Sequence, residues 1–284
     1  MNYKSILNLL GILLGIFSLS FIPPLILTYM YSESGGEVFL YSFLFFGIFG
    51  CAIWAATRQK NLTLNISDGF VITTLFWVVL ACAGSVPFYF FGLSVSDAIF
   101  ESASGITTTG ATTIVGLDNL PKSILLYRQL LQWIGGMGLI VLAVAVMPAL
   151  GIGGGQLYKM ELPGSHGNQK LTPKITDSAK ALWKIYVGLT VACATLYLLS
   201  GMNVFDSIAH SLSTVAGGGF STHDGSIGFF DSALIEAVCI IFMLLSAASF
   251  AVHYAAIFGG KPLKYFYDSE FRFFLSVVLL IVVI

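Results

Sequence analysis

The sequence predicts an all-α protein that crosses a membrane several times, and three observations support this fold class. The 284 residues are 57% hydrophobic and only 10% charged, with a mean hydropathy of +0.90, whereas soluble domains carry about 25% charged residues. The apolar residues gather in stretches that approach or exceed the roughly 20 needed for a spanning helix. A Gly- and Thr-rich segment between these stretches has a second copy further along the chain.

Six apolar stretches are long enough to cross a bilayer. We expect spanning helices over 5–30, 38–57, 69–92, 121–150, 180–201 and 230–258. The first is longer than the apolar core of a signal peptide and is expected to be retained. A further helix begins near Phe271 and is too short to cross by Ile284. We therefore expect the chain to be the first part of a longer protein.

Basic residues predict the orientation, because Lys and Arg favour the cytoplasmic side. With a cytoplasmic N-terminus, the 13 Lys and Arg residues lie on that side, except Lys122 and Arg128. This holds only if segments 93–120 and 202–229 return to the side they left. Each contains an apolar piece of about ten residues, which is too short to span and suits a re-entrant half-helix.

An internal repeat supports the two half-helices. The segment DAIFESASGITTTGATT (97–113) aligns without a gap with DSIAHSLSTVAGGGFST (206–222), and the two share Asp, Ile, two Ser, Gly and Thr at matching positions. Both copies follow a spanning helix that runs in the same direction. They are therefore predicted to be parallel repeats, related by an axis along the membrane normal.

The repeated segments have the composition of an ion-coordinating loop. Asp97 and Asp206 open the half-helices and are expected to cap them at the positive helix end. About ten residues extend about 15 Å, to mid-membrane, where irregular backbone must be buried or line a water-filled path. Carbonyl oxygens there can replace the hydration shell of a cation. The predicted filter residues are Thr107, Thr108, Thr109, Gly110 and Ala111, with Gly217, Gly218, Gly219, Phe220 and Ser221.

Four stretches resemble a known family: SGITTTGATTI, RQLLQWIGGMGLIVLAVAVMP, STVAGGGFSTHDGSIG and GGKPLKYFYDSEFRFF. The sequence is similar to the TrkH branch of the TrkH/KtrB/HKT superfamily of potassium transporters. The resemblance implies four helix–pore-loop–helix repeats around a pseudo-fourfold pore, preceded by two extra N-terminal helices. It implies that Gly110 and Gly219 are the filter glycines. It also implies that the transported ion is K⁺, and that Rb⁺ is transported as well. It also implies a homodimer in the bacterial inner membrane, with a cytosolic nucleotide-binding regulatory subunit of the TrkA type.

The expected organisation follows from the spans and the repeat. Two N-terminal helices are followed by two repeats, separated by a cytoplasmic loop, and by the start of a third repeat. The boundaries are 1–68, 69–150, 151–179, 180–258 and 259–284.

Other functions stay open at this point. Broken helices near mid-membrane also occur in transporters coupled to Na⁺ or H⁺, so a symporter is an alternative, although the few buried acids favour passive conduction. A non-conducting fragment is another alternative, because two repeats provide half of a four-loop filter. We do not expect an enzyme, and the histidines lack the spacing of metal ligands.

Three further features have two interpretations each. Arg128 lies inside an expected span, where charge is costly; it either reaches the outer interface or acts at the pore loops and outer mouth. Glu101, whose repeat partner is His210, either forms hydrogen bonds behind the filter or attracts ions. The glycines of IGGMG (134–138) indicate close helix packing or a hinge.

Overall fold

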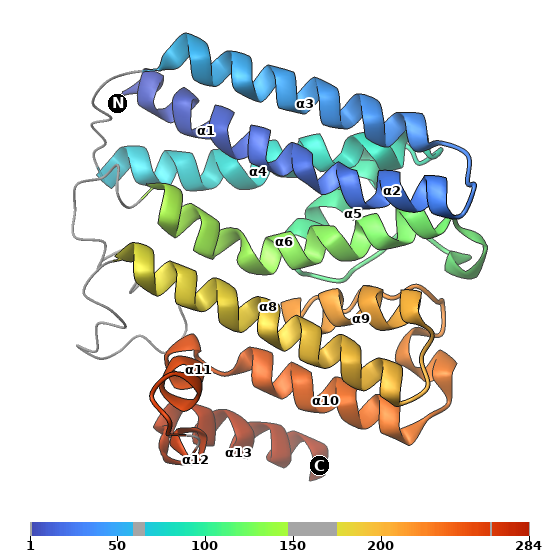
Figure 1. The fold of residues 1–284 in the computed structure, drawn as a ribbon, viewed down its shortest axis with the longest axis vertical. Helices are drawn as coiled ribbons and strands as arrows, with labels where there is room; N and C mark the ends of the chain where they lie inside the picture. Colours follow the sequence, from blue (N-terminus) through green and yellow to red (C-terminus); the bar gives the residue numbers. More distant parts are fainter. Residues whose placement is uncertain (1, 59–65, 147–174, 262, 284) are drawn as a thin grey trace.

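The computed structural model describes residues 2–58, 66–146, 175–261 and 263–283. These residues form helices and contain no strand. The long helices lie side by side, with the N-terminal helices at one edge of the molecule and the C-terminal helices at the other (Figure 1). Among the described residues, four helices are long and apolar enough to cross a membrane: Tyr3–Met30, Gly36–Thr57, Ser67–Phe90 and Ala181–Leu199.

An N-terminal pair precedes the repeats. The first rod consists of α1 (Tyr3–Ser18), η1 (Leu19–Phe21) and α2 (Ile22–Met30), and α3 (Gly36–Thr57) packs along it. Prolines fit the first turn of α2 because its N–H groups have no partner within the helix. The helices approach closely at two glycines, since a Cβ on Gly11 would lie 2.9 Å from the Gly50 carbonyl oxygen.

The first repeat consists of α4 (Ile66–Phe90), α5 (Val95–Ile106), η2 (Leu117–Asn119) and α6 (Lys122–Val146). The 12-residue α5 is the expected half-helix. The end of α4 and the start of α6 lie at the same end of the bundle, as Figure 1 shows. The intervening segment therefore returns to the side that it left, as the basic residues predicted.

The second repeat has the same order: α8 (Ile175–Leu199), α9 (Val204–Ala216), η3 (Ser226–Phe230) and α10 (Ala233–Ala247). Its half-helix α9 has 13 residues and packs between α6 and α8. Gly92 and Gly201 occupy matching positions before the half-helices, with φ of +100° and +107°. Both turns need this left-handed conformation, which glycine adopts without steric cost.

The expected continuous span over 230–258 is wrong. The chain instead forms η3, α10 and α11 (Phe250–Ile257), with Ala248 in an extended conformation at the break. The break leaves the Leu245 carbonyl without a regular helical partner, and His253 Nε2 (2.9 Å) and the Ala248 N–H (3.0 Å) supply hydrogen bonds to it. A local backbone N–H and one side chain thus replace the missing helical bond.

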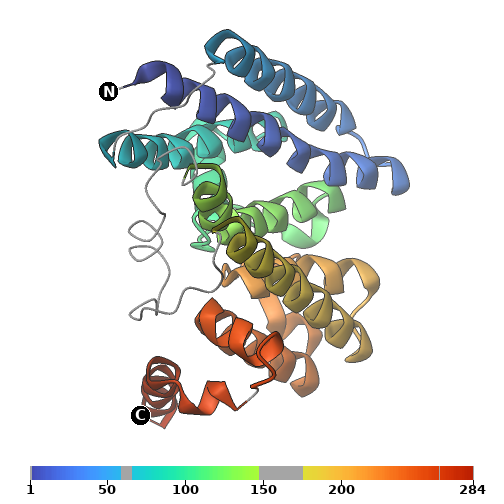
Figure 2. The same cartoon turned by 60° about the vertical axis from the view of Figure 1, so that its left-hand side comes forward.

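The remaining segments follow the expected order. The chain continues through α12 (Lys264–Tyr267) and α13 (Ser269–Val283), the helix expected near Phe271. Helix α8 begins at Ile175, five residues before the expected start of the second repeat. Most of the expected cytoplasmic loop 151–179 lies outside the described residues. Figure 2 shows α10 to α13 at the edge of the bundle opposite α1 and α3.

Candidate functional site

The two half-helices begin with matching caps. Ser94 and Asn203 are the N-cap residues, and each side chain accepts a hydrogen bond from the backbone N–H of the aspartate three positions later. In return, Ser94 Oγ donates to Asp97 Oδ2 (2.7 Å) and Asn203 Nδ2 donates to Asp206 Oδ2 (2.6 Å). The two aspartates therefore lie in the first helical turn, not at the N-cap position itself. Each carboxylate accepts from the side chain of the N-cap residue, so the pair resembles a capping box without its bond to the N-cap backbone N–H.

The loops after the half-helices share an unusual backbone. Thr108 and Gly217 are equivalent in the repeat and have φ of +54° and +69°. Gly110 and Gly219 are also equivalent and have φ of +77° and +85°. A positive φ is strained for any residue with a Cβ, so Thr108 keeps this geometry at some cost. The alternation of left-handed and ordinary residues is thus the same in both loops.

The loops meet at Gly110. A Cβ on Gly110 would overlap the carbonyl oxygen of Gly218, so the space between the loops admits only glycine there. Gly219 faces open space, and a Cβ on it would meet no heavy atom within 4 Å. The requirement for glycine is therefore steric and conformational at Gly110, and only conformational at Gly219.

Two carbonyl groups of the predicted filter are held by protein donors. Ser104 Oγ donates to the Ala111 carbonyl oxygen (2.5 Å), and Arg128 Nη1 donates to the Ser221 carbonyl oxygen (3.1 Å). Phe220 is also turned away from open space: its side chain is buried, and the Arg128 guanidinium carbon lies 4.3 Å from its ring centroid. Ala111 and Ser221 therefore anchor the loops through their carbonyl groups, and Phe220 through its side chain.

A buried ion pair lies behind both loops. Arg128 Nε donates to Glu101 Oε1 at 2.7 Å, and both side chains are 0% exposed. Arg128 Nη2 also donates to Thr112 Oγ1 (3.0 Å), and the Thr112 hydroxyl and Thr113 N–H donate to the Glu101 carboxylate. Because Arg128 also binds the Ser221 carbonyl, one side chain connects both loops. The interpretation of Arg128 as an outer-interface residue is therefore wrong.

The second loop uses different anchors at equivalent positions. His210, which matches Glu101, places Nε2 3.0 Å from Ser221 Oγ, and Ser221 matches Thr112. His210 Nδ1 lies 3.0 Å from the Asp206 carbonyl oxygen, which can only accept, so Nδ1 donates. A neutral ring then accepts the Ser221 hydroxyl through Nε2. Thr222 Oγ1 donates to Asp206 Oδ1 (2.7 Å) and ties the returning chain to the helix start.

Gln132 is an anchor that the sequence did not single out. Its side chain is fully buried, and its Oε1 accepts hydrogen bonds from Ser213 Oγ (2.7 Å) and the Phe220 N–H (3.0 Å). It also lies against Gly218, where a Cβ would collide with the Gln132 amide. A polar residue in an apolar span is the signal that could have indicated this role.

Glycines on α6 receive the ends of both half-helices. A Cβ on Gly135 would overlap the Ile106 carbonyl at the end of α5, and a Cβ on Gly136 would lie 3.2 Å from Ala216 Cα at the end of α9. The IGGMG glycines therefore provide close packing, which was one of the two interpretations of this motif.

Ionisable residues join the segments that follow the two loops. His223 bridges Asp118 of the first repeat and Asp206 of the second, through Nδ1 and Nε2. The hydrogen bond from His223 lowers the pKa of Asp118 below its usual value of 3.8. Asp224 Oδ1 accepts from the N–H groups of Gly116 (3.0 Å) and Leu117 (3.1 Å). These aspartates thus connect the repeats, in addition to placing negative charge near the loops.

A family model described as cation transport protein, TrkH, matches residues 35–284. The chain belongs to the TrkH family. It is 49% identical to the Trk system potassium uptake protein TrkH of Vibrio parahaemolyticus over 99% of this chain and 59% of that protein. It is 46% identical to the TrkH protein of Escherichia coli K12 and 42% identical to its TrkG protein, over 100% of this chain and 59% of each relative.

A solved structure agrees with the fold. The crystal structure of the potassium transporter TrkH from Vibrio parahaemolyticus superposes with a TM-score of 0.85 at 47% identity, over 99% of this chain and 57% of that chain. The chain therefore spans about 59% of the length of the curated relatives it matches. The family comparison agrees with the similarity to the TrkH branch that the sequence analysis found.

Proposed function

We propose that this chain contributes two pore loops to a K⁺ uptake pathway across the bacterial cytoplasmic membrane. The observation that carries the proposal is the matching backbone of the loops, with left-handed residues at Thr108 and Gly110 and again at Gly217 and Gly219. Each loop follows the C-terminal end of a half-helix, whose partial negative charge favours a cation. The names of the relatives specify potassium uptake.

The proposed ligands are backbone carbonyls. Thr107 to Gly110 and Gly217 to Gly219 supply oxygens that replace part of the hydration shell of K⁺, while Ala111, Phe220 and Ser221 anchor them. The loops differ in sequence and in their anchors, so the filter is less uniform than one made of identical loops. We expect K⁺ and Rb⁺ to pass and Na⁺ to pass less well.

The assembly is proposed from the family. A ring of four loops needs two loops besides the pair described, and the resemblance places all four in one polypeptide that dimerises. A cytosolic TrkA-type subunit would gate the pathway, and the N-terminus would lie in the cytoplasm. Family membership and the four apolar spanning helices support this placement.

The proposal is tested by Rb⁺ uptake into vesicles that contain this chain, alone and within a protein of the relatives' full length. Gly110→Ser should abolish uptake, because its Cβ would overlap the Gly218 carbonyl at a φ of +77°. Gly188→Ser on α8 is the matched control, since a Cβ there meets no heavy atom within 4 Å. Normal uptake by a well-inserted Gly110→Ser variant would disprove the filter assignment.

Ion gradients separate passive conduction from symport. Passive flux should follow the K⁺ gradient and the membrane potential with no Na⁺ or pH gradient present. Uptake that requires either second gradient would support the coupled transporter, and no uptake by any inserted form would support the non-conducting alternative.

A further inference from the structure

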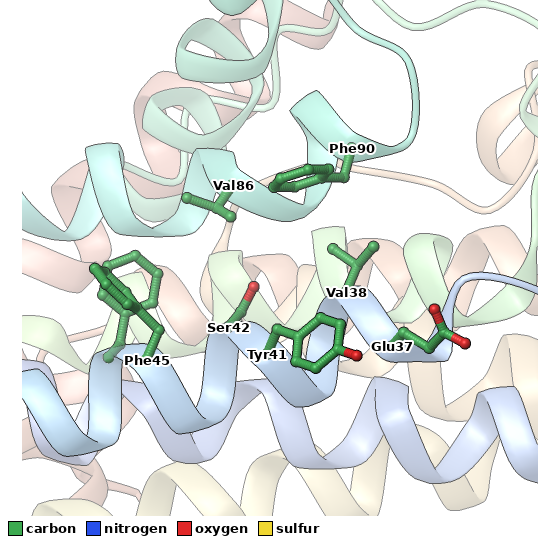
Figure 3. A pocket seen from close by; sticks show the side chains of 8 residues that line it. Glu37, Val38, Tyr41, Ser42, Phe45, Val86 and Phe90 are labelled. Carbon is green, nitrogen blue, oxygen red and sulfur yellow. The ribbon is translucent and has the colours of Figure 1, made fainter.

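An apolar groove lies between α3 and α4, away from the pore loops. It has a volume of about 460 Å³, and most of its lining is aromatic or aliphatic. Figure 3 shows Val86 and Phe90 of α4 facing α3 across the groove, with Glu37 at one end of the α3 row and Phe45 at the other. Tyr41 and Phe45 are 65% and 62% exposed, so the groove opens on the surface of the bundle.

The location determines what surrounds the groove. Both helices are long and apolar enough to cross a membrane, and Tyr41 and Phe45 are exposed, so we expect this surface to face hydrocarbon. The groove follows α3 from Glu37 to Phe46, a length of about 14 Å at 1.5 Å per residue. Half of the hydrocarbon core is about 15 Å thick. The groove thus matches the depth of one leaflet, and a straight lipid acyl chain fits along it.

The charge at the end of the groove favours one headgroup chemistry. Glu37 lies in the first turn of α3, is exposed, and takes part in none of the ion pairs among the described residues. The helix terminus explains why an acid is favourable there, but it leaves the carboxylate open to the lipid interface. An anionic headgroup would be repelled, whereas a primary ammonium can donate hydrogen bonds to the carboxylate.

We propose that this groove binds one acyl chain of a phosphatidylethanolamine, with its ammonium group paired to Glu37. Ser42, buried at 3% exposure on the floor of the groove, leaves room for the chain where a larger residue would fill it. In the proposed orientation the site lies in the outer leaflet. The inference rests on the two spanning helices and does not depend on the filter assignment.

Native mass spectrometry of the purified chain with equal amounts of POPE and POPG tests the headgroup. We expect one POPE to be retained in preference to POPG, and Glu37→Gln to reduce this preference about threefold, in the range of a partly exposed ion pair. Glu236→Gln is the matched control, because Glu236 is another exposed acid in the first turn of a helix, α10. Equal retention of the two lipids by the parent chain would overturn the headgroup assignment.

Filling the groove tests the location. Val86→Trp should abolish POPE retention, whereas Ile240→Trp, on the exposed face of α10, should leave it unchanged. In POPE/POPG vesicles with a tracer phosphatidylethanolamine carrying a diazirine in its acyl chain, parent-chain cross-links should concentrate at 37–46 and 86–90. Retention unaffected by Val86→Trp, or cross-links spread evenly over the spanning helices, would overturn the proposal. The parent cross-links decide it even if Val86→Trp fails to fold.

Discussion

Replacing Arg128 by methionine should destabilise the protein and damage both loops. The change removes hydrogen bonds to Glu101 (2.7 Å), Ser221 (3.1 Å) and Thr112 (3.0 Å), and leaves the Glu101 carboxylate buried without a cation. Breaking a buried ion pair from one side costs about 3–5 kcal/mol. For a chain of this size such a loss corresponds to a fall in Tm of about 10 °C.

A second substitution shows whether the unpaired Glu101 charge causes the loss of stability. Glu101→Gln combined with Arg128→Met removes both buried charges, so the double variant should be more stable than Arg128→Met alone. Arg128→Lys keeps the charge but lacks the planar fork that reaches three partners. Compared with Arg128→Met, Arg128→Lys should therefore regain part of the lost stability. It should regain a smaller part of the preference for Rb⁺ over Na⁺.

Thermal unfolding in detergent measures stability, and vesicle uptake measures selectivity. Lys122→Met is the control, because it removes a charge from the start of the same helix. The Lys122 ammonium group lies 4.0 Å from the Tyr31 ring centroid and 5.4 Å from that of Phe205, and it takes part in none of the ion pairs among the described residues. A fall in Tm equal to that of this control, with unchanged Rb⁺ and Na⁺ uptake, would refute the assignment of Arg128 as the connection between the loops.

Three other predictions concern single contacts. Gly219→Ala should lower Rb⁺ uptake less than Gly110→Ala, because Gly219 faces open space and only its φ of +85° opposes a Cβ; equal losses in the uptake assay would contradict this. Gln132→Leu should cost about 1–3 kcal/mol, since the buried Phe220 N–H loses its acceptor, and unfolding in denaturant measures the loss. His223 lowers the pKa of Asp118, so this contact stabilises the fold at pH values above 3.8 and is lost as pH falls through the lowered pKa. Asp118→Asn should therefore lower Tm near neutral pH and make it less sensitive to acid, and a parallel pair of Tm–pH curves would argue against the contact.

The architecture follows from patterns that are local in the sequence. Apolar stretches predicted the long helices, and the gapless repeat predicted two half-helices followed by matching loops. The caps were misplaced by three residues because the repeat identities begin at Asp97 and Asp206. The capping residues Ser94 and Asn203 differ in type, so they do not appear as identities, although each makes a capping pair with the aspartate.

The contacts behind the loops could not be predicted in the same way. Glu101 and Arg128 are 27 positions apart, and their pairing depends on how α5 packs on α6. The break after α10 was missed for a similar reason, because the His253 side chain binds the Leu245 carbonyl and so makes the break tolerable. Periodicity and composition indicate which surfaces are apolar. They do not indicate which buried polar groups form hydrogen bonds or ion pairs with one another.

The two loops combine one backbone geometry with two kinds of anchor. The first loop uses a carboxylate, Glu101, and therefore needs a cation within reach, since an unpaired buried charge is costly. The second loop uses His210, which as a neutral ring can donate to the Asp206 carbonyl and accept from Ser221 without a counter-ion. Arg128 then has a donor to spare for the Ser221 carbonyl. Because the second loop has His in place of Glu, a single buried cation meets the charge requirement of both loops.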